Sequence, residues 1–399
     1  MPRLSQRALN MPPSPIRKLV PYAEDAKRRG IKVYHLNIGQ PDIPTPQVML
    51  DAFRNHQIKV LEYGHSAGLW EYREGLARYY QQYDIAVTKE EIIVTTAGSE
   101  AIIFAMMATM DHEDEILIPE PFYTNYIGFA HEAGVKIVPI TCYAEDGFRL
   151  PPDEQILNKI TPRTRVILIC NPNNPTGYVY TREELERVRK IALDHDLFII
   201  SDEVYREFVF DGAVHHSILH FPGIDDRAIL VDSISKRYSA CGARIGCLVT
   251  HNKEILETAL RFGQARLCPP TLEQIAALAA LNTPASYFEE VMQEYRRRRD
   301  IVVDALQEIP GVICQKPQGA FYTIAKLPVD DADKFSQWLL EEFHDNNETV
   351  MLAPANGFYA TPGMGIDEVR IAFVLNTKAM QRSMEILKKA LSVYPGRVK

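Results

Sequence analysis

A lysine preceded by small hydroxyl residues and followed by a glycine-flanked arginine is the part of the sequence best suited to covalent chemistry. Lys236 ends the sequence Ser-Ile-Ser-Lys directly after an apolar run, and Arg244 follows within Gly-Ala-Arg-Ile-Gly. An amine that forms an imine must be partly neutral near pH 7, and burial beside other cations lowers a lysine pKa. Ser233, Ser235 and Arg244 are suited to hold a phosphate group, because arginine offers a planar fork of donors. The pattern S-x-S-K-x5-G-x-R-x-G therefore predicts an imine-forming lysine beside a bound phosphate.

A carboxylate and a phenol follow a second apolar run. Asp202 comes directly after Leu-Phe-Ile-Ile-Ser, and Tyr205 stands three residues further on. An acid in this place could simply cap the next helix. It could also bind a ligand, because ligands of open α/β sheets collect beyond the carboxyl ends of the strands. The segment D-x-x-Y alone does not separate these two interpretations.

Two turns rich in glycine, proline or asparagine also follow apolar runs. Residues 171–177 read N-P-N-N-P-T-G, a composition that is common in plain turns. Gly98 and Ser99 stand in Thr-Ala-Gly-Ser-Glu, where an apolar run gives way to a predicted helix. The first backbone N–H groups of a helix have no partners within it and attract anions. We therefore expect Gly98 and Ser99 to donate backbone hydrogen bonds to a phosphate.

The elements that must position these residues form an alternating pattern of strands and helices. Between residues 46 and 290, short β-branched runs alternate with amphipathic stretches, as in β-α units around a mostly parallel sheet. The runs are almost continuously apolar, which indicates strands covered on both faces. The predicted strands are Ile92–Thr96, Glu115–Pro119, Lys136–Ile140, Arg165–Cys170, Leu197–Ser201, Ala228–Asp232 and Ile245–Thr250. Together they predict an α/β fold with a seven-stranded sheet, in which the last strand is the candidate for a reversed direction.

The rest of the chain does not continue this alternation of strands and helices. A long helix over Ala285–Gln307 leads to a C-terminal region with predicted strands Gly319–Ala325 and Glu368–Val374 and helices near residues 331–343 and 378–394. The proline-rich first 45 residues predict an arm and a connecting loop. We therefore expect an N-terminal arm and small-domain segment (1–45), a large domain (46–290) and a smaller α+β domain (291–399).

Taken in order, these motifs resemble those of the class I and II aminotransferases, which are fold-type I pyridoxal-phosphate enzymes. The likeness runs from Gly39 to Arg370 and rests mainly on the lysine motif and on N-P-x-N-P-T-G. It implies that Lys236 binds pyridoxal 5'-phosphate as a Schiff base and acts as acid and base in a ping-pong transfer between an amino acid and a 2-oxo acid. The chain is similar to aspartate aminotransferases, so aspartate and 2-oxoglutarate are one candidate pair; aromatic amino acids or alanine are the alternatives.

The resemblance also implies roles for residues around the cofactor ring. Asp202 would pair with the pyridine nitrogen, and Tyr123 would lie against the ring face. Tyr205 and Asn174 would bond the ring 3-oxygen, and Asn174 would also contact the substrate. On this basis Lys236, Asp202 and Tyr205 are the expected catalytic residues.

Substrate binding and assembly follow from the same resemblance. Arg370, in Glu-Val-Arg-Ile-Ala-Phe, matches the arginine that clamps the substrate α-carboxylate, and Gly39 matches the loop whose backbone touches that carboxylate. Tyr63 is similar to the tyrosine that crosses to the neighbouring subunit's phosphate, so the site would need a homodimer. The chain departs from aspartate-specific relatives, which carry a basic residue for the distal carboxylate. Arg17 and Arg266 are the candidate substitutes, and a surface or interface role is the alternative for each.

Composition argues against several other classes of protein. The formal charge of −8 disfavours a nucleic-acid partner, and the basic run Arg296–Arg299 is interpreted as a solvated face of the long helix. The 6 cysteines have no C-x-x-C pair or metal-ligand spacing, so we expect reduced thiols and no metal site. The sequence has no recognisable secretion signal or membrane-spanning apolar run, which predicts a cytoplasmic protein that binds no membrane.

Other functions share part of this pattern. A carbon–sulfur β-lyase of the same fold would carry every motif above, and the sequence does not separate it from a transaminase. A ligand-sensing regulator built on the fold would need an added DNA-binding module, and we expect no room for one before Gly39. A nicotinamide dehydrogenase is disfavoured because Gly363-Met-Gly365 lacks the third glycine of G-x-G-x-x-G and opens no predicted β-α-β unit.

Overall fold

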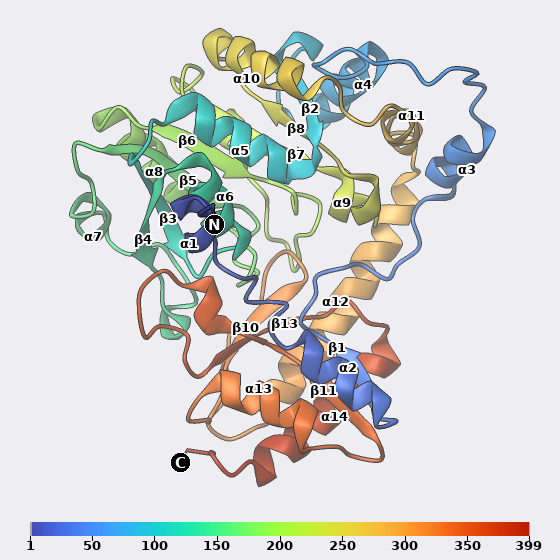
Figure 1. Cartoon of the computed structure of the whole chain (residues 1–399), viewed down its shortest axis with the longest axis vertical. Coiled ribbons are helices and arrows are strands. Elements are labelled where there is room, and N and C mark those ends of the chain that lie inside the picture. Colours follow the sequence, from blue (N-terminus) through green and yellow to red (C-terminus); the bar gives the residue numbers. More distant parts are fainter. Residues whose placement is uncertain (1, 399) are drawn as a thin grey trace.

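A seven-stranded sheet forms the centre of the larger part of the molecule (Figure 1). The computed structural model describes residues 2–398. The strand order is β2-β8-β7-β6-β5-β3-β4, and β8 runs antiparallel to both of its neighbours whereas the other pairs are parallel. The strands are β2 (Ile92–Thr96), β3 (Glu115–Glu120), β4 (Lys136–Thr141), β5 (Thr164–Cys170), β6 (Phe198–Asp202), β7 (Ala228–Ser233) and β8 (Ile245–Val249). The predicted α/β fold, its seven strands and the reversed direction of the last strand are confirmed.

Helices cover both faces of this sheet, which explains why the strands are apolar throughout. Along β5, Val166 and Leu168 pack toward one face, whereas Ile167 and Ile169 pack toward the other. This alternation follows from the two-residue period of a strand. One face is covered by α5 (Ala97–Thr109), α6 (Asn125–Ala133) and α10 (Lys253–Arg266), and the other by α4 (Trp70–Gln81), α8 (Arg182–Asp194) and α11 (Thr271–Ala280).

The smaller part of the molecule is an antiparallel sheet packed against long helices (Figure 1). Its strand order is β12-β13-β10-β9, and Arg370 on β13 pairs with Ile324 on β10. The elements are α12 (Ala285–Gln307), β9 (Ile313–Cys314), β10 (Tyr322–Lys326), α13 (Ala332–Glu341), β11 (Glu348–Met351), β12 (Ala353–Pro354), β13 (Glu368–Ala372) and α14 (Thr377–Val393). The helix α12 runs from one part of the molecule to the other.

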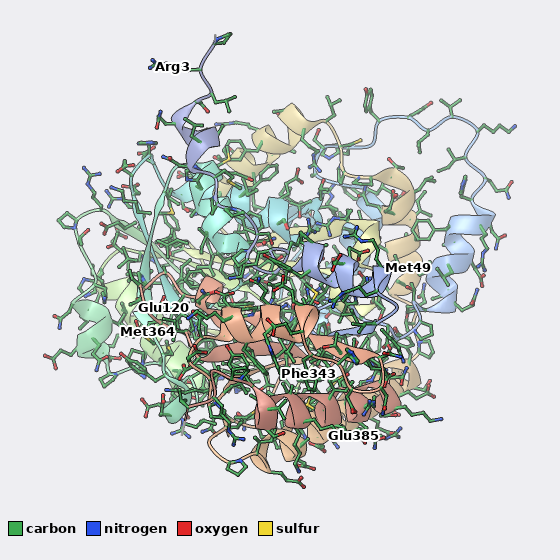
Figure 2. All side chains as sticks on the ribbon, turned by 60° about the horizontal axis from the view of Figure 1, so that its bottom comes forward. Arg3, Met49, Glu120, Phe343, Met364 and Glu385 are labelled. Atoms are coloured by element: carbon green, nitrogen blue, oxygen red, sulfur yellow. The ribbon has the colours of Figure 1, made fainter. Side chains whose placement is uncertain are left out.

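The N-terminal segment packs against this smaller part. β1 (Lys32–His35) pairs in parallel with β11, and α2 (Val20–Arg28) lies on α13. The arm that precedes α2 contains the short helix α1 (Gln6–Asn10), and Figure 2 shows Arg3 at its projecting tip. The division into residues 1–45, 46–290 and 291–399 stays a prediction.

The basic run on α12 is a solvated face only in part. Arg296 and Arg297 are exposed as expected, whereas Arg298 and Arg299 are buried and pair with partly exposed carboxylates. Arg298 bonds Asp42 at 2.6 Å, and Arg299 bonds Asp211 at 2.7 Å. The remaining α-helices are α3 (Gln47–Asn55), α7 (Asp153–Leu157) and α9 (Ile234–Arg237). Short 3-10 helices lie at Lys89–Glu91, Ala144–Asp146, Ile218–His220, Cys241–Ala243 and Ala355–Phe358. Within residues 2–398, no helix combines the length and apolarity that a membrane crossing requires.

Candidate active site

A cavity of about 640 Å³ opens where the carboxyl ends of the parallel strands meet the smaller part of the molecule. This is the position at which open α/β sheets bind their ligands. All of the predicted site residues except Tyr63 line it. They are Gly39, Gly98, Ser99, Tyr123, Asn174, Asp202, Tyr205, Ser233, Ser235, Lys236, Arg244 and Arg370. Tyr63 lies on the connection between α3 and α4 and is 80% exposed.

The side chain of Lys236 lies in the cavity, at the end of β7 and on the short helix α9. Its Nζ donates to the carbonyl oxygen of Gly39 at 2.9 Å and to the Cys241 thiol at 3.7 Å. Burial lowers the pKa of Lys236, but Tyr322, Cys241 and Tyr123 raise it and the net shift is upward. The expected lowering is therefore wrong for the free chain, because its amine faces phenols and a thiol instead of cations.

Asp202 ends β6 as a buried acid with unused hydrogen-bonding capacity. Its Oδ2 accepts a hydrogen bond of 2.6 Å from Tyr126, whereas its Oδ1 accepts one long contact of 3.4 Å from the amide of Val204. Burial raises the pKa of Asp202 to about 6, against the lowering effect of the Tyr126 hydroxyl. A cationic N–H donor in the cavity would restore the ordinary charged state of this acid.

The start of α5 forms an anion cradle on the floor of the cavity. The N-cap residue Thr96 makes no side-chain hydrogen bond to α5. The Ala97 N–H already donates to the carbonyl oxygen of Arg244, so the amides of Gly98 and Ser99 are the ones left available to an anion. Gly246 allows β8 to pass directly beneath this turn, because a Cβ on it would lie 2.4 Å from the carbonyl carbon of Ala97. Beside the cradle, the Ser233 hydroxyl donates to Ser235 Oγ at 2.8 Å, which holds both hydroxyls at the cavity wall.

Arg244 stands at the rim of the same cradle. Its backbone is left-handed, with φ of 55°, and its carbonyl oxygen accepts a hydrogen bond of 3.1 Å from Ala97 N–H. Its guanidinium is exposed and donates to the carbonyl oxygen of Cys241 at 3.1 Å. The loop thus presents a cation next to the start of α5 and the two serine hydroxyls.

Asn174 and Tyr205 converge on one point of the cavity from different strands. The Asn174 amide donates to the Tyr205 hydroxyl at 3.5 Å, and that hydroxyl lies 3.0 Å from the Tyr322 hydroxyl. All three side chains are buried. Two donors aimed at one point are suited to a single phenolic oxygen of a ligand.

Arg370 is a buried cation that reaches the cavity from β13. Its Nη1 donates to Asn174 Oδ1 at 3.1 Å and its Nη2 to the carbonyl oxygen of Asn37 at 2.5 Å. Its Nε has no hydrogen-bond partner among the described residues, although it is buried. Burial lowers the pKa of Arg370, but an arginine stays charged at pH 7. The guanidinium therefore retains donor capacity for a carboxylate.

Three residues in or directly behind the cavity were not singled out in the sequence: Tyr322 and Cys241 line the cavity, whereas Tyr126 is not part of its lining. Tyr126 holds Asp202, Tyr322 contacts Tyr205, and Cys241 contacts Lys236. The two tyrosines stand in ordinary apolar stretches, so no sequence signal separates them from core residues. The cavity wall also includes Met11–Arg17, the segment after α1.

The two arginines proposed for a distal substrate group are placed very differently. Arg17 lines the cavity, is exposed, and makes no ion pair with any residue of the described range 2–398. Arg266 is absent from the cavity lining and bonds Glu100 at 3.1 Å. Only Arg17 is therefore positioned to meet a ligand in this cavity.

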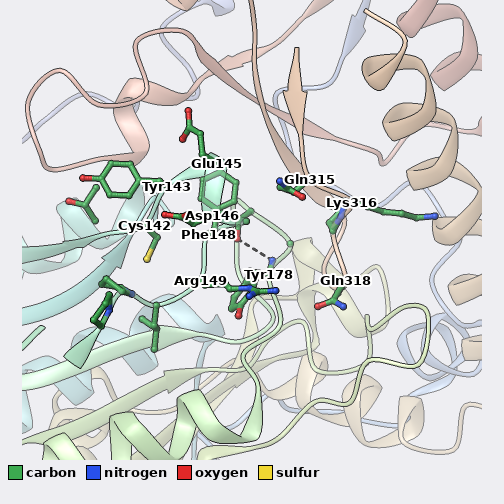
Figure 3. A pocket seen from close by; sticks show the side chains of 18 of the residues that line it. Cys142, Tyr143, Glu145, Asp146, Phe148, Arg149, Tyr178, Gln315, Lys316 and Gln318 are labelled. Atoms are coloured by element: carbon green, nitrogen blue, oxygen red, sulfur yellow. Dashed lines mark hydrogen bonds between the residues drawn. The ribbon is translucent and has the colours of Figure 1, made fainter. Parts of the chain in front are cut away.

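A second cavity of about 800 Å³ is larger than the first (Figure 3). It lies between the segment that follows β4 and residues 315–318, with Arg149, Tyr178 and Lys316 around it. Lys316 already bonds Asp300 at 2.9 Å, and none of the predicted site residues lines this cavity. We therefore assign the chemistry to the smaller cavity, where buried acid, amine and guanidinium groups meet.

The described residues fit pyridoxal 5'-phosphate. The uncapped start of α5 with the serine hydroxyls matches its phosphate, and Asp202 has a free lone pair for a protonated ring nitrogen. The Asn174–Tyr205 pair matches its phenolic oxygen, and Lys236 supplies the amine. This fold and this site define a fold-type I pyridoxal-phosphate enzyme.

Comparison with known proteins gives the family. Residues 31–387 match the family model described as aminotransferase class I and II. The aspartate aminotransferase of Bacillus subtilis is 31% identical over 398 residues, covering 97% of this chain and 98% of that protein. Aromatic-amino-acid aminotransferase 2 of Thermococcus litoralis is 33% identical over 397 residues, with the same coverage of 97% and 98%. The chain belongs to the class I and II aminotransferase family and uses pyridoxal phosphate.

A solved structure agrees with this assignment. A single mutant of Thermus thermophilus aspartate aminotransferase superposes with a TM-score of 0.90 at 29% identity, covering 98% of this chain and all of the other. The named substrates of these relatives differ, since one is an aspartate and another an aromatic-amino-acid enzyme. Family membership therefore establishes an aminotransferase and leaves its substrates to the residues of this chain.

Proposed function

We propose that the enzyme exchanges an amino group between an L-amino acid with an acidic side chain and 2-oxoglutarate. The observation that carries this proposal is the arrangement of two arginines in one cavity, with Arg370 at its inner end and Arg17 at its outer wall. A buried guanidinium binds a carboxylate through two parallel hydrogen bonds. A second, exposed guanidinium favours a substrate with a second carboxylate.

Each residue has a distinct task in this proposal. Arg370 and the backbone near Gly39 orient the substrate α-carboxylate. The Nζ of Lys236 accepts the proton that leaves the substrate Cα, and would then donate it to the cofactor carbon that bears the amino nitrogen. Pyridoxal phosphate, when bound, supplies an electron-withdrawing ring that stabilises negative charge on that Cα. Asp202 maintains the charge of the ring nitrogen, and the start of α5 with Ser233 and Ser235 holds the phosphate.

An amino-donor panel against 2-oxoglutarate tests the proposal. The donors are aspartate, alanine, tyrosine, phenylalanine, lysine and kynurenine, and glutamate formation is the readout. We expect aspartate to give the highest kcat/KM. A preference for an uncharged donor of about tenfold or more would contradict the acidic substrate, and release of ammonia and pyruvate from cysteine conjugates without glutamate formation would favour a β-lyase.

We also propose that the active enzyme is a cytoplasmic homodimer. The connection between α3 and α4 carries exposed apolar side chains, which water does not favour. They are Val60, Leu61 and Tyr63, and exposed Trp70 follows as the first residue of α4. A second subunit would cover these side chains. Tyr63 of one subunit would then lie at the phosphate cradle of the other.

A further inference from the structure

We infer that the buried ion pair Asp232–Arg237 is a positioning clasp for Lys236. The two residues bracket the segment 233–236, which contains the imine-forming lysine and both serines of the phosphate site. Their side chains are each 1% exposed, and Arg237 Nη2 donates to Asp232 Oδ2 at 2.5 Å. The inference rests on the proposed role of Lys236 and concerns how the chain fixes that residue.

Asp232 is tied to the turn itself as well as to its partner. Its Oδ1 accepts a hydrogen bond of 2.7 Å from the amide of Ser233, and its Oδ2 accepts one of 2.9 Å from the Tyr80 hydroxyl. Because Ser233, Tyr80 and Arg237 all donate to this carboxylate, the first residue of the turn has little freedom. The end of β7 and the end of α9 are thereby joined across the residues that carry the chemistry.

Arg237 is fixed from its other side by a second carboxylate and an aromatic ring. Its Nε donates to Glu207 Oε1 at 2.6 Å, and its guanidinium lies 4.1 Å from the centre of the Tyr79 ring. The Tyr79 hydroxyl also bonds Glu207. Because a planar guanidinium satisfies several partners at once, its orientation is set more rigidly than that of a lysine.

The clasp continues to the strand that carries Asp202. Arg206 donates to Asp232 Oδ2 at 3.4 Å and to Glu203 Oε2 at 3.1 Å, and Glu203 directly follows Asp202. The ends of β6 and β7 are therefore joined behind the cavity by buried, charged hydrogen bonds. We expect this connection to fix the distance between the acid at one strand end and the amine at the next.

The charged residues of the clasp and its extension do not line the active-site cavity, so none of them is a catalytic residue. They are Asp232, Arg237, Arg206, Glu203 and Glu207. Their effect acts through the placement of Lys236, and misplacing a catalytic group by about 1 Å can cost on the order of a hundredfold in rate.

The test compares Arg237→Met and Asp232→Asn with Arg299→Met. Arg299 is a matched control, because it is equally buried, bonds Asp211 and Asp300, and lies 4.8 Å from the Phe210 ring, away from the cavity. Three quantities are measured: deuterium exchange of the amides of residues 233–238 in apoprotein, the rate of chromophore formation with added pyridoxal phosphate, and kcat and KM separately.

We expect both clasp variants to exchange these amides about tenfold faster and to form the chromophore about tenfold more slowly, with kcat reduced and KM changed less than about threefold. Arg299→Met should lower the Tm without these effects. Asp232→Asn changes one atom of similar size, so it remains testable if Arg237→Met does not fold.

Two results would overturn the clasp. One is an equal effect of Arg299→Met on amide exchange and chromophore formation, which would show that the clasp variants act only by lowering the overall stability of the fold. The other is opposite effects of the two clasp variants, which would indicate local charge instead of position, because one removes a negative and the other a positive group. Failure of the wild-type protein to form any chromophore would instead contradict the role of Lys236 itself.

Discussion

Lys236 donates a hydrogen bond of 2.9 Å from Nζ to the carbonyl oxygen of Gly39, a residue 197 positions earlier in the chain. The same loop accepts a hydrogen bond from Arg370 through the carbonyl oxygen of Asn37. The loop thus contacts both the amine and the guanidinium that the proposed reaction needs. Its shape is restricted, because a Cβ on Gly39 would lie 1.7 Å from the Tyr322 hydroxyl oxygen.

We expect Gly39→Ala to lower kcat/KM by about tenfold or more, because the methyl group must displace either the loop or Tyr322. Steady-state kinetics with the preferred amino donor give the measurement. Gly242→Ala is the control, since a Cβ there meets no atom within 4 Å. Tyr322→Ala should restore part of the activity in the Gly39→Ala background, and equal losses in Gly39→Ala and Gly242→Ala would contradict this explanation.

The buried acid makes the stability of the apoprotein depend on pH. Burial raises the pKa of Asp202 to about 6 in the folded chain, from 3.8 ordinarily, so the folded state holds a proton that the unfolded state has released. Asp202 therefore contributes about 3 kcal/mol to the free energy of unfolding. This contribution is fully present below about pH 4 and is lost as the pH rises through about 6. Urea unfolding of apoprotein between pH 4 and 7 should reveal this slope, and Asp202→Asn should remove it. An unchanged slope in the variant would assign the effect to other groups.

We expect Arg370→Met to raise the KM for amino donor and 2-oxo acid, so that kcat/KM falls by about a hundredfold or more. The reason is that the α-carboxylate loses a buried guanidinium that can bind it through two parallel hydrogen bonds. Arg370→Lys should recover little, because an ammonium cannot present the planar fork. The affinity for pyridoxal phosphate, measured by absorbance titration, should change by less than about threefold. A large loss of cofactor affinity would instead point to a role in holding the ring.

The sequence predicted the sheet and most of the residues that gather in the candidate site, because both depend on local patterns. Strands covered on both faces are continuously apolar, and the site motifs directly follow those strands. Tyr322 and Tyr126 were missed because their partners, Tyr205 and Asp202, lie 117 and 76 positions away and leave no periodic trace. The pKa of Lys236 was predicted in the wrong direction, since its neighbours come from other segments.

Arg17 is the residue on which the proposed substrate class depends. We expect Arg17→Gln to raise the KM for aspartate and 2-oxoglutarate by about tenfold, because an exposed ion pair contributes about 1 kcal/mol or somewhat more when partly shielded. The KM for alanine should stay within about twofold, since alanine has no distal carboxylate. Arg266→Gln provides the comparison, as Arg266 bonds Glu100 outside the cavity lining. Equal effects of Arg17→Gln on aspartate and alanine would exclude a distal-carboxylate role.

The exposed position of Tyr63 leads to a prediction about subunit sharing. If the Tyr63 hydroxyl reaches the phosphate of a neighbouring subunit, Tyr63→Ala inactivates the active site of the neighbouring subunit. Lys236→Ala inactivates the active site of its own subunit. Mixing the two inactive variants should then restore about a quarter of the wild-type activity, because half of the dimers are mixed and each has one intact site. Activity is measured after the subunits have been exchanged under mild denaturation, and Tyr63→Ala mixed with itself is the control. If the mixture stays as inactive as its components, the active site is built from one subunit alone.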